Sequence, residues 1–272
     1  MALTILNSIS DLTAENALSN TQTSLQKTLT ELSTGLKINS GSDDAAGLSI
    51  ANGLQANISA LTQSSQNASD GVGLLQTADG ALSQVTTLLD RAVTLATEAS
   101  TGGLSASQAT ALDTEYQSIL SEVGNIGSTT NYNGSAIFGT TANVYTSDGT
   151  AAGSATIATT INALTTAALA LTGTNLTSAA NAQTALADIT TAIGTVAANR
   201  GAIGAAVNQL TADTNVENTE VTNLTAAQNS IQNADIGQTV AQMTQYNVLQ
   251  QTGMAALSQA NQVQQAVLKL LQ

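Results

Sequence analysis

Residues 42–100 have the sequence SDDAAGLSIANGLQANISALTQSSQNASDGVGLLQTADGALSQVTTLLDRAVTLATEAS, and this stretch decides the fold. Apolar and small residues recur along it at alternating steps of four and three, with one seven-residue step that spans Asp79. This is the spacing of a coiled-coil seam, so the stretch predicts one long helix packed lengthwise on partners. The predicted rod seam contains Leu54, Ile58, Leu61, Val72, Leu75, Leu82, Val85 and Leu89.

Both ends of this stretch carry helix boundary signals. Ser42 is a candidate N-cap, and Asp43 and Asp44 place negative charge where exposed N–H groups and the helix dipole favour it. Gly102 and Gly103 predict the end of the helix. At 1.5 Å per residue it would be about 80 Å long, more than a compact domain of this size needs. The alternative is an ordinary core helix, but the length favours a rod.

The composition supports long helices and disfavours catalysis. Of the 272 residues, 8% are charged and 2% aromatic, and there is no His, Cys, Pro or Trp. Since Pro inside a helix costs about 3 kcal/mol, its absence fits uninterrupted helices. Most acid–base, nucleophilic and transition-metal sites need His or Cys. We therefore expect no enzyme, no cofactor and no metal, and we interpret Asp43 and Asp44 as capping groups.

Charge and hydropathy restrict the partners. A net charge of −13 disfavours nucleic acid and anionic membranes. The start of the chain lacks a basic segment followed by an apolar one, so we expect no general secretory signal peptide. No segment approaches the roughly 18 apolar residues that span a bilayer. The sequence therefore predicts no membrane insertion, and any export would need another route.

Helical spacing returns on both sides of this stretch. Residues 1–40 predict an amphipathic helix that ends near Gly35, followed by a break at 39–42. Residues 109–126 predict an antiparallel partner for the long helix, 186–231 a second long helix, and 236–272 a terminal helix that Asp235 caps. The order predicts a mainly α, elongated coiled-coil helical hairpin rod with paired terminal helices and a small β-hairpin or irregular insert.

The expected division is a terminal-helix domain of 1–40 plus 235–272, a rod domain of 42–138 plus 178–234, and a short surface insert at 139–177. Within the insert, a turn at Ser147–Gly149 predicts a hairpin, whereas residues 163–172 fit a helix equally well. Four polar residues occupy seam positions in the second long helix. They either fix the register of the helices or face water: Arg200, Thr214, Glu217 and Gln228.

Two segments at opposite ends resemble the signatures of bacterial flagellin. They are LSTGLKINSGSDDAAGLSIAN at 32–52 and VLQQTGMAALSQANQVQQAVLKLLQ at 248–272. With the shorter matches at 67–71 and 131–134, the resemblance covers about 1–138 and 180–272. The sequence departs from the family pattern at Gln209, where Arg is common, and at Gly237 and Thr239.

The resemblance implies a structural subunit that polymerises into the extracellular helical filament of the flagellum, for motility. The terminal helices would form the inner coiled-coil tube, with the rod around it. The implied partners are copies of the chain itself, the flagellar type III export machinery, an export chaperone, and cap and junction proteins. The expected inner-tube polymerisation face contains Leu18, Leu25, Leu29, Leu32, Leu36, Leu249, Leu257, Val263, Val267 and Leu271.

The terminal helices pose a physical problem that assembly solves. Two paired helices bury only one seam, so their remaining apolar faces need copies of the chain, and the ends would fold on assembly. The alternatives are a hook–filament junction protein, an enzyme on a flagellin scaffold, for which His is missing, and a secreted coiled-coil adhesin.

The resemblance also implies a contact site for a host Toll-like receptor. It maps an Arg, a Leu and a Glu of the family onto Arg91, Leu95 and Glu115. Residues 92–94, Ala-Val-Thr, lack the charge that strongly recognised members carry, so we expect weak receptor activation. The alternative role for Arg91 and Glu115 is to pair between neighbouring rods in the filament.

Overall fold

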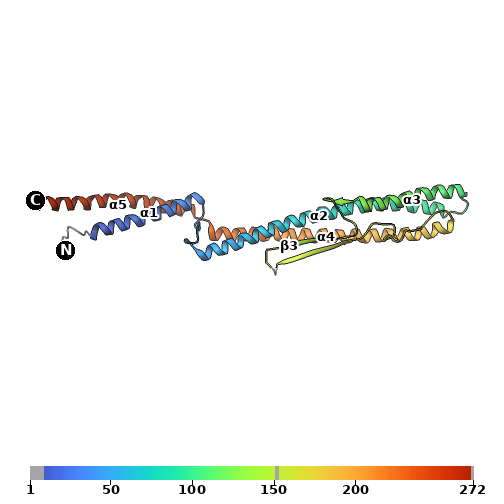
Figure 1. Ribbon diagram of the computed structural model, residues 1–272, viewed down its shortest axis with the longest axis horizontal. Coiled ribbons are helices and arrows are strands. Elements are labelled where there is room, and N and C mark those ends of the chain that lie inside the picture. Colours follow the sequence, from blue (N-terminus) through green and yellow to red (C-terminus); the bar gives the residue numbers. More distant parts are fainter. Residues whose placement is uncertain (1–8, 151–152, 271–272) are drawn as a thin grey trace. The chain divides into compact units, whose positions relative to one another are not determined.

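The computed structural model describes residues 9–150 and 153–270, and helices dominate them (Figure 1). No helix of the described part is long and apolar enough to cross a membrane. The elements in chain order are α1 (Ile9–Thr34), α2 (Ala45–Ala99), α3 (Ala106–Thr129), β1 (Asn131–Tyr132), β2 (Ser135–Ala136), β3 (Thr140–Ser147), β4 (Ser154–Ile161), α4 (Ala179–Gln232) and α5 (Ile236–Leu270). The predicted mainly helical fold with a small β insert is confirmed.

The chain forms two compact units. Unit 1 consists of residues 1–55 and 224–272, and unit 2 of residues 56–223. The division between these units falls inside α2 and α4. The start of α2 and the end of α4 belong to unit 1, where Gln228 Nε2 donates to Gln55 Oε1 at 3.0 Å.

Unit 2 is built around a heptad seam on α2. From Leu61 to Ala99 a buried residue follows every three or four positions without interruption. Ala78 fills the predicted seven-residue step, and Gly71 occupies the seam next to Val72, which is half-buried. The buried positions of the seam are Leu61, Ser64, Ala68, Gly71, Leu75, Ala78, Leu82, Val85, Leu89, Ala92, Ala96 and Ala99.

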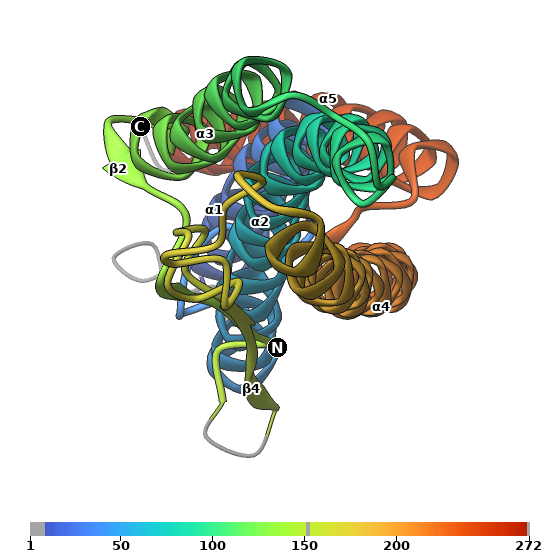
Figure 2. The same ribbon diagram turned by 90° about the vertical axis from the view of Figure 1, so that its right-hand side faces the viewer.

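α3 and α4 flank α2 and complete the core (Figures 1 and 2). A capping box starts α3, because Ser105 Oγ accepts from Gln108 N and the Gln108 side chain accepts from Ser105 N. The buried face of α4 is rich in alanine, which lets helices approach closely. It contains Ala182, Ala185, Ile189, Ala192, Val196, Ile203, Ala206, Leu210 and Glu217.

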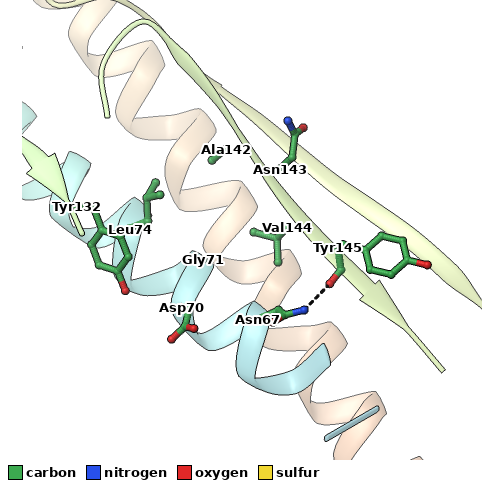
Figure 3. Close-up of a pocket in the computed structure, with 9 residues that line it drawn as sticks. All are labelled: Asn67, Asp70, Gly71, Leu74, Tyr132, Ala142, Asn143, Val144 and Tyr145. Carbon is green, nitrogen blue, oxygen red and sulfur yellow. Dashed lines mark hydrogen bonds between the residues drawn. The ribbon is translucent and has the colours of Figure 1, made fainter. Parts of the chain in front are cut away.

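The predicted hairpin is present in unit 2. β3 and β4 pair antiparallel from Thr140 with Ile161 to Ser147 with Ser154. β3 lies along α2, and a Cβ at Gly71 would collide with the Val144 side chain, so glycine permits this close approach (Figure 3). Residues 163–172 form turns and a bend, not a helix, but they bury Leu164, Leu169 and Leu171.

In unit 1, α1 and α5 pack side by side (Figure 1). The start of α2 differs from the prediction: the N-cap is Asp44, not Ser42. Asp44 Oδ1 accepts from Gly47 N at 2.9 Å, and its carbonyl accepts from Leu48 N. Asp235 caps α5 as predicted, because its Oδ1 accepts from Gln238 N at 3.1 Å.

Candidate functional site

The paired helices α1 and α5 of unit 1 are the candidate functional site. The side of α1 that faces inward carries residues at three- and four-residue steps: Ala14, Leu18, Thr21, Leu25, Thr28 and Leu32. On α5 the corresponding residues are Thr239, Met243, Tyr246, Gln250, Gly253 and Leu257. A Cβ at Gly253 would lie 3.4 Å from Leu18 Cδ1, so the two helices approach closely at this point. The pair thus has one continuous seam.

This seam is only weakly apolar. Its most buried side chains are Thr28, 3% exposed, and Thr239, 4% exposed. Thr28 Oγ1 donates to Ser24 O at 2.9 Å, and Thr239 Oγ1 donates to Asp235 O at 2.7 Å, so both hydroxyls bond within their own helix. Since hydrophobic stabilisation scales with the apolar area removed from water, this seam contributes little of it.

Large apolar side chains instead lie exposed on unit 1. We define the apolar α5 surface as Val240, Val248, Leu249, Met254 and Val263, which are 40–54% exposed. At about 100° per residue, Val248 points away from the seam, Leu249 and Val263 point to one side, and the other two point to the opposite side. Within the described chain α5 thus exposes apolar side chains on several faces, between polar Gln, Asn and Thr residues.

The predicted polymerisation face contains two kinds of residue. Leu18, Leu25, Leu32, Leu36 and Leu257 are half-buried, whereas Leu29, Leu249 and Val263 are exposed. The side chain of Val267 and all of Leu271 lie outside the described residues.

Sequence reasoning missed other exposed apolar residues: Ile9, Leu12, Val240, Val248 and Met254. They were missed because the polymerisation face was predicted from a single seam repeat. A search for apolar residues outside that repeat would have found them.

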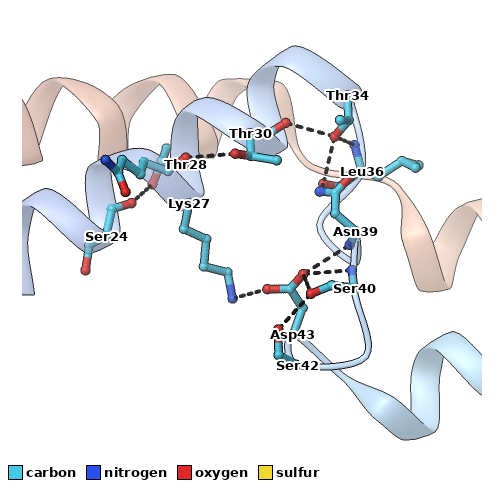
Figure 4. Close-up of polar contacts among 11 residues, drawn as sticks. Ser24, Lys27, Thr28, Thr30, Thr34, Leu36, Asn39, Ser40, Ser42 and Asp43 are labelled. Atoms are coloured by element: carbon cyan, nitrogen blue, oxygen red, sulfur yellow. Dashed lines mark hydrogen bonds and ion pairs between the residues drawn. The ribbon is translucent and has the colours of Figure 1, made fainter.

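A polar cluster orders the connection between α1 and α2 (Figure 4). Lys27 Nζ lies 3.1 Å from Asp43 Oδ1. Asp43 Oδ2 accepts from Asn39 N, Ser40 N and Ser40 Oγ at 3.0–3.2 Å. The hydrogen bond from Lys27, followed by those from Ser40 and Asn39, lowers the pKa of Asp43 to about 2. Asp43 therefore ties α1 to the turn that precedes α2.

The two chain breaks in unit 1 are joined by backbone hydrogen bonds. Leu36 and Asn233 form an antiparallel β-bridge. Lys37 N donates to Gln232 O at 2.7 Å, and Ala234 N donates to Gly35 O at 2.9 Å. We call this pairing of residues 35–37 with 232–234 the break bridge.

The residues predicted for the rod seam are placed as follows. Leu61, Leu75, Leu82, Val85 and Leu89 are 0–2% exposed. Val72 is half-buried and packs against the core. Leu54 and Ile58 are half-buried near the unit boundary.

Three of the four polar seam residues of α4 have partners on α2, which favours the register interpretation. Arg200 Nε and Nη2 donate to Asp79 Oδ1 and Oδ2 at 2.8 and 3.3 Å. Ser64 Oγ donates to Glu217 Oε1, and Gln228 bonds Gln55. Thr214 instead donates to Leu210 O of its own helix. The pairs show that α2 and α4 run antiparallel.

The predicted contact residues Arg91, Leu95 and Glu115 do not form one surface. Arg91 Nε lies 2.8 Å from Glu115 Oε1, and both side chains are about half exposed. They pair within the chain, and a pairing between neighbouring rods stays a prediction. Leu95 is fully buried in the core of unit 2, so its side chain is not accessible in the described chain.

A cavity of about 350 Å³ lies between α2 and β3 (Figure 3). Its lining includes Asp70, Asn67, Tyr132 and Tyr145, and Asn67 Nδ2 donates to Tyr145 O at 3.3 Å. The lining holds no cation and no activated nucleophile. Among the described residues no cluster of three His, Cys, Asp or Glu could hold a metal ion.

Comparison with known proteins decides the family. Residues 5–143 match the bacterial flagellin N-terminal helical region, and residues 186–271 match the bacterial flagellin C-terminal helical region. The chain belongs to the bacterial flagellin family. It is a structural subunit of the helical filament of the bacterial flagellum, and no match favours the hook–filament junction alternative.

Individual relatives differ in length. The chain is 34% identical over 248 residues to a flagellin of Halalkalibacterium halodurans, which covers 90% of this chain and 91% of the relative. It is 39% identical over 134 residues to flagellin 1 of Proteus mirabilis, covering 49% of this chain and 37% of the relative. The crystal structure of Bacillus cereus flagellin is 32% identical, with a TM-score of 0.49 over 60% of this chain and 94% of that one.

Proposed function

We propose that the chain polymerises through its α1–α5 pair, with the apolar α5 surface as the main contact between subunits. The observation that carries this proposal is the uneven distribution of exposed apolar side chains. Of the twelve large hydrophobic residues that are exposed in the described chain, ten belong to unit 1 and two, Tyr145 and Val216, to unit 2. Large exposed apolar patches mark protein contacts.

The proposed contact has a sufficient driving force. Full burial of a Val, Leu or Met side chain contributes about 1.5–3 kcal/mol. Each subunit of a filament repeats the contact with its neighbours, and a head-to-tail contact that does not close on itself produces an open helical polymer. Of the predicted inner-tube residues, Leu249 and Val263 belong to the apolar α5 surface, and Leu29 is exposed on α1.

The test is Val248→Asp, compared with Val216→Asp. Both valines are more than half exposed, Val248 on α5 and Val216 on α4, so neither change should unfold the monomer. Burying an unpaired carboxylate in a subunit contact is strongly unfavourable. We expect Val248→Asp to abolish filaments in electron micrographs and sedimentation, and Val216→Asp to retain them. Filaments of Val248→Asp at the wild-type critical concentration would contradict the proposal.

We also propose that the terminal pair gains order on assembly. The most buried side chains of its seam are Thr28 and Thr239 and its leucines are only half-buried, so an isolated α1–α5 pair has limited apolar burial to offset the conformational entropy of ordering. Circular dichroism should therefore show more helix per residue in filaments than in monomers. Equal helicity in the two states would contradict this.

The remaining assignments rest on the family. We propose that the chain acts without catalysis or cofactor, outside the cell, and that it serves motility. Its further partners would be the flagellar type III export machinery, an export chaperone, and cap and junction proteins. Export of the chain from a strain that lacks the flagellar export apparatus would contradict the export assignment.

A further inference from the structure

One carboxyl group occupies a seam position in the interior of unit 2. Glu217 follows Ile203, Ala206 and Leu210 on the buried face of α4 and is 6% exposed. An ionised carboxylate in such a position is costly unless hydrogen bonds or a cation compensate the charge. Its surroundings therefore decide its protonation state.

Among the described residues, no cation pairs with Glu217. The five basic residues of the chain are Lys27, Lys37, Arg91, Arg200 and Lys269, and the nearest of these along α4, Arg200, pairs with Asp79. On α4 the neighbouring charges are Asp213 and Glu220, both acidic. Residues 56–69 of α2 carry no charge, and Asp148 is the only charged residue in 131–161. Burial, helped by Asp213 and Glu220, raises the pKa of Glu217.

A single hydroxyl supports the carboxylate. Ser64 of α2, 3% exposed, donates from Oγ to Glu217 Oε1. Glu217 Oε2 is buried, and the described residues offer it no hydrogen-bond partner. The hydrogen bond from Ser64 therefore opposes the rise in the pKa of Glu217.

The same hydroxyl holds the end of the hairpin. Ser147, the last residue of β3, donates its backbone N–H to Ser64 Oγ at 2.9 Å. A hydrogen-bond chain thus runs from the Ser147 amide through Ser64 to Glu217. Each bond in such a chain polarises the next, so an ionised Glu217 makes Ser64 a better acceptor for the amide.

We propose that Ser147, Ser64 and Glu217 form a proton-controlled latch, which holds the end of the β3–β4 hairpin on α2 and α4 while Glu217 is ionised and loosens when it is protonated. The direction follows from reciprocity. Burial favours the protonated carboxyl, whereas the hydrogen bond from Ser64 favours the ionised one, and docking of the hairpin acts on this bond through the Ser147 amide. Through this bond docking favours the ionised carboxyl, so proton binding weakens docking by the same factor. A difference of one pKa unit between docked and undocked states corresponds to a tenfold change in docking.

The rest of the hairpin has independent attachments to α2. Val144 packs over Gly71, and Asn67 Nδ2 donates to Tyr145 O. Neither contact involves Glu217. The latch therefore acts locally, on the Ser147 end of β3, and leaves the Val144 end in place.

Amide hydrogen exchange of the full-length monomer, measured by NMR and corrected for intrinsic rates, tests the latch. We expect exchange at Ser147 to accelerate about tenfold between pH 7.5 and 4.5, with Val144 unchanged. Glu217→Gln should show fast, pH-independent exchange at Ser147. The matched control is Asp90→Asn, an exposed acid on α2 that is not one of the charges beside Glu217, and it should behave as the wild type.

A second measurement tests the same hydrogen-bond chain without the Glu217→Gln variant, which could fold poorly. Carboxyl NMR titration should show a higher pKa for Glu217 in Ser64→Ala than in the wild type. An unchanged pKa in Ser64→Ala would overturn the proposal. So would pH-independent exchange at Ser147 in the wild type, or equal acceleration at Ser147 and Val144.

Discussion

The α1–α5 pair of unit 1 and the helices of unit 2 use the same alternation of three- and four-residue steps, yet they bury different side chains. In unit 2, Leu75, Leu82 and Leu89 are at most 1% exposed. In unit 1 the most buried seam residues of the pair are Thr28 and Thr239, while apolar side chains cover the outside of α5. A heptad spacing therefore predicts that helices pair, but not whether the pair is sufficient by itself.

Removing α5 should show the largest difference between the two units. Truncation before Ile236 leaves the buried seam of α2 from Leu61 to Ala99 intact, so unit 2 should unfold at an unchanged midpoint in urea. The truncated chain should form no filaments, because half of the α1–α5 pair is gone. Deleting residues 147–154 at the hairpin tip is the control and should leave assembly intact. Filaments of the truncated chain would show that unit 2 polymerises alone.

A Leu→Ala pair measures the difference in burial directly. Leu89 is fully buried in unit 2, and its replacement should cost about 2–5 kcal/mol of unfolding free energy. Leu29 is 46% exposed on α1, and its replacement should cost the monomer less than about 1 kcal/mol. Urea unfolding of both variants decides it. Equal losses of unfolding free energy in the two variants would contradict the difference in burial between the units.

The Asp43 cluster predicts an acid-sensitive step confined to unit 1. Because the folded-state pKa of Asp43 is lowered from 3.8 to about 2, its contacts are fully present above pH 3.8 and are lost as the pH falls towards 2. Lys27→Gln removes the largest cause and should raise the pKa of Asp43, which carboxyl NMR measures. A pKa that stays near 2 would assign the effect to Ser40 and Asn39 instead.

The smallest effect is expected at Arg200 and Asp79 in unit 2. Their side chains are 37% and 40% exposed, so solvent screens the pair and its loss should cost at most about 1 kcal/mol. A double-mutant cycle with Arg200→Gln and Asp79→Asn measures the coupling free energy. Asp90→Asn, on α2 like Asp79, is the control for the loss of one negative charge. A coupling of several kcal/mol would mean that the pair, not the apolar seam, dominates this part of unit 2.

The sequence predicted what repeats locally and missed what depends on distant contacts. The α2 seam was predictable because Leu75, Leu82 and Leu89 follow one helical period. Gly71 was missed in the seam, because its burial depends on Val144, which is distant in sequence. The sequence offered Ser42 as a candidate N-cap and Asp43 and Asp44 as capping groups, and the path of the entering chain decides that Asp44 takes the N-cap position.

For the candidate site, the sequence predicted the paired terminal helices but not which apolar residues remain exposed. Leu18 and Leu249 have the same residue type and similar spacing, yet one is half-buried in the seam and the other is 44% exposed. The difference depends on how α1 and α5 are rotated about their axes. A single-sequence pattern does not contain that rotation.

The break bridge has a mechanical consequence. Two unconnected linkers, one after α1 and one before α5, would bend independently, and the register of the terminal helices could slip. The hydrogen bonds of Lys37 to Gln232 and of Ala234 to Gly35 fasten the two linkers to each other. Movement of one linker relative to the other would therefore break these hydrogen bonds. A bending or twisting load on the terminal helices is thus shared by both chain segments, and the phase between α1 and α5 is preserved while the linkers move.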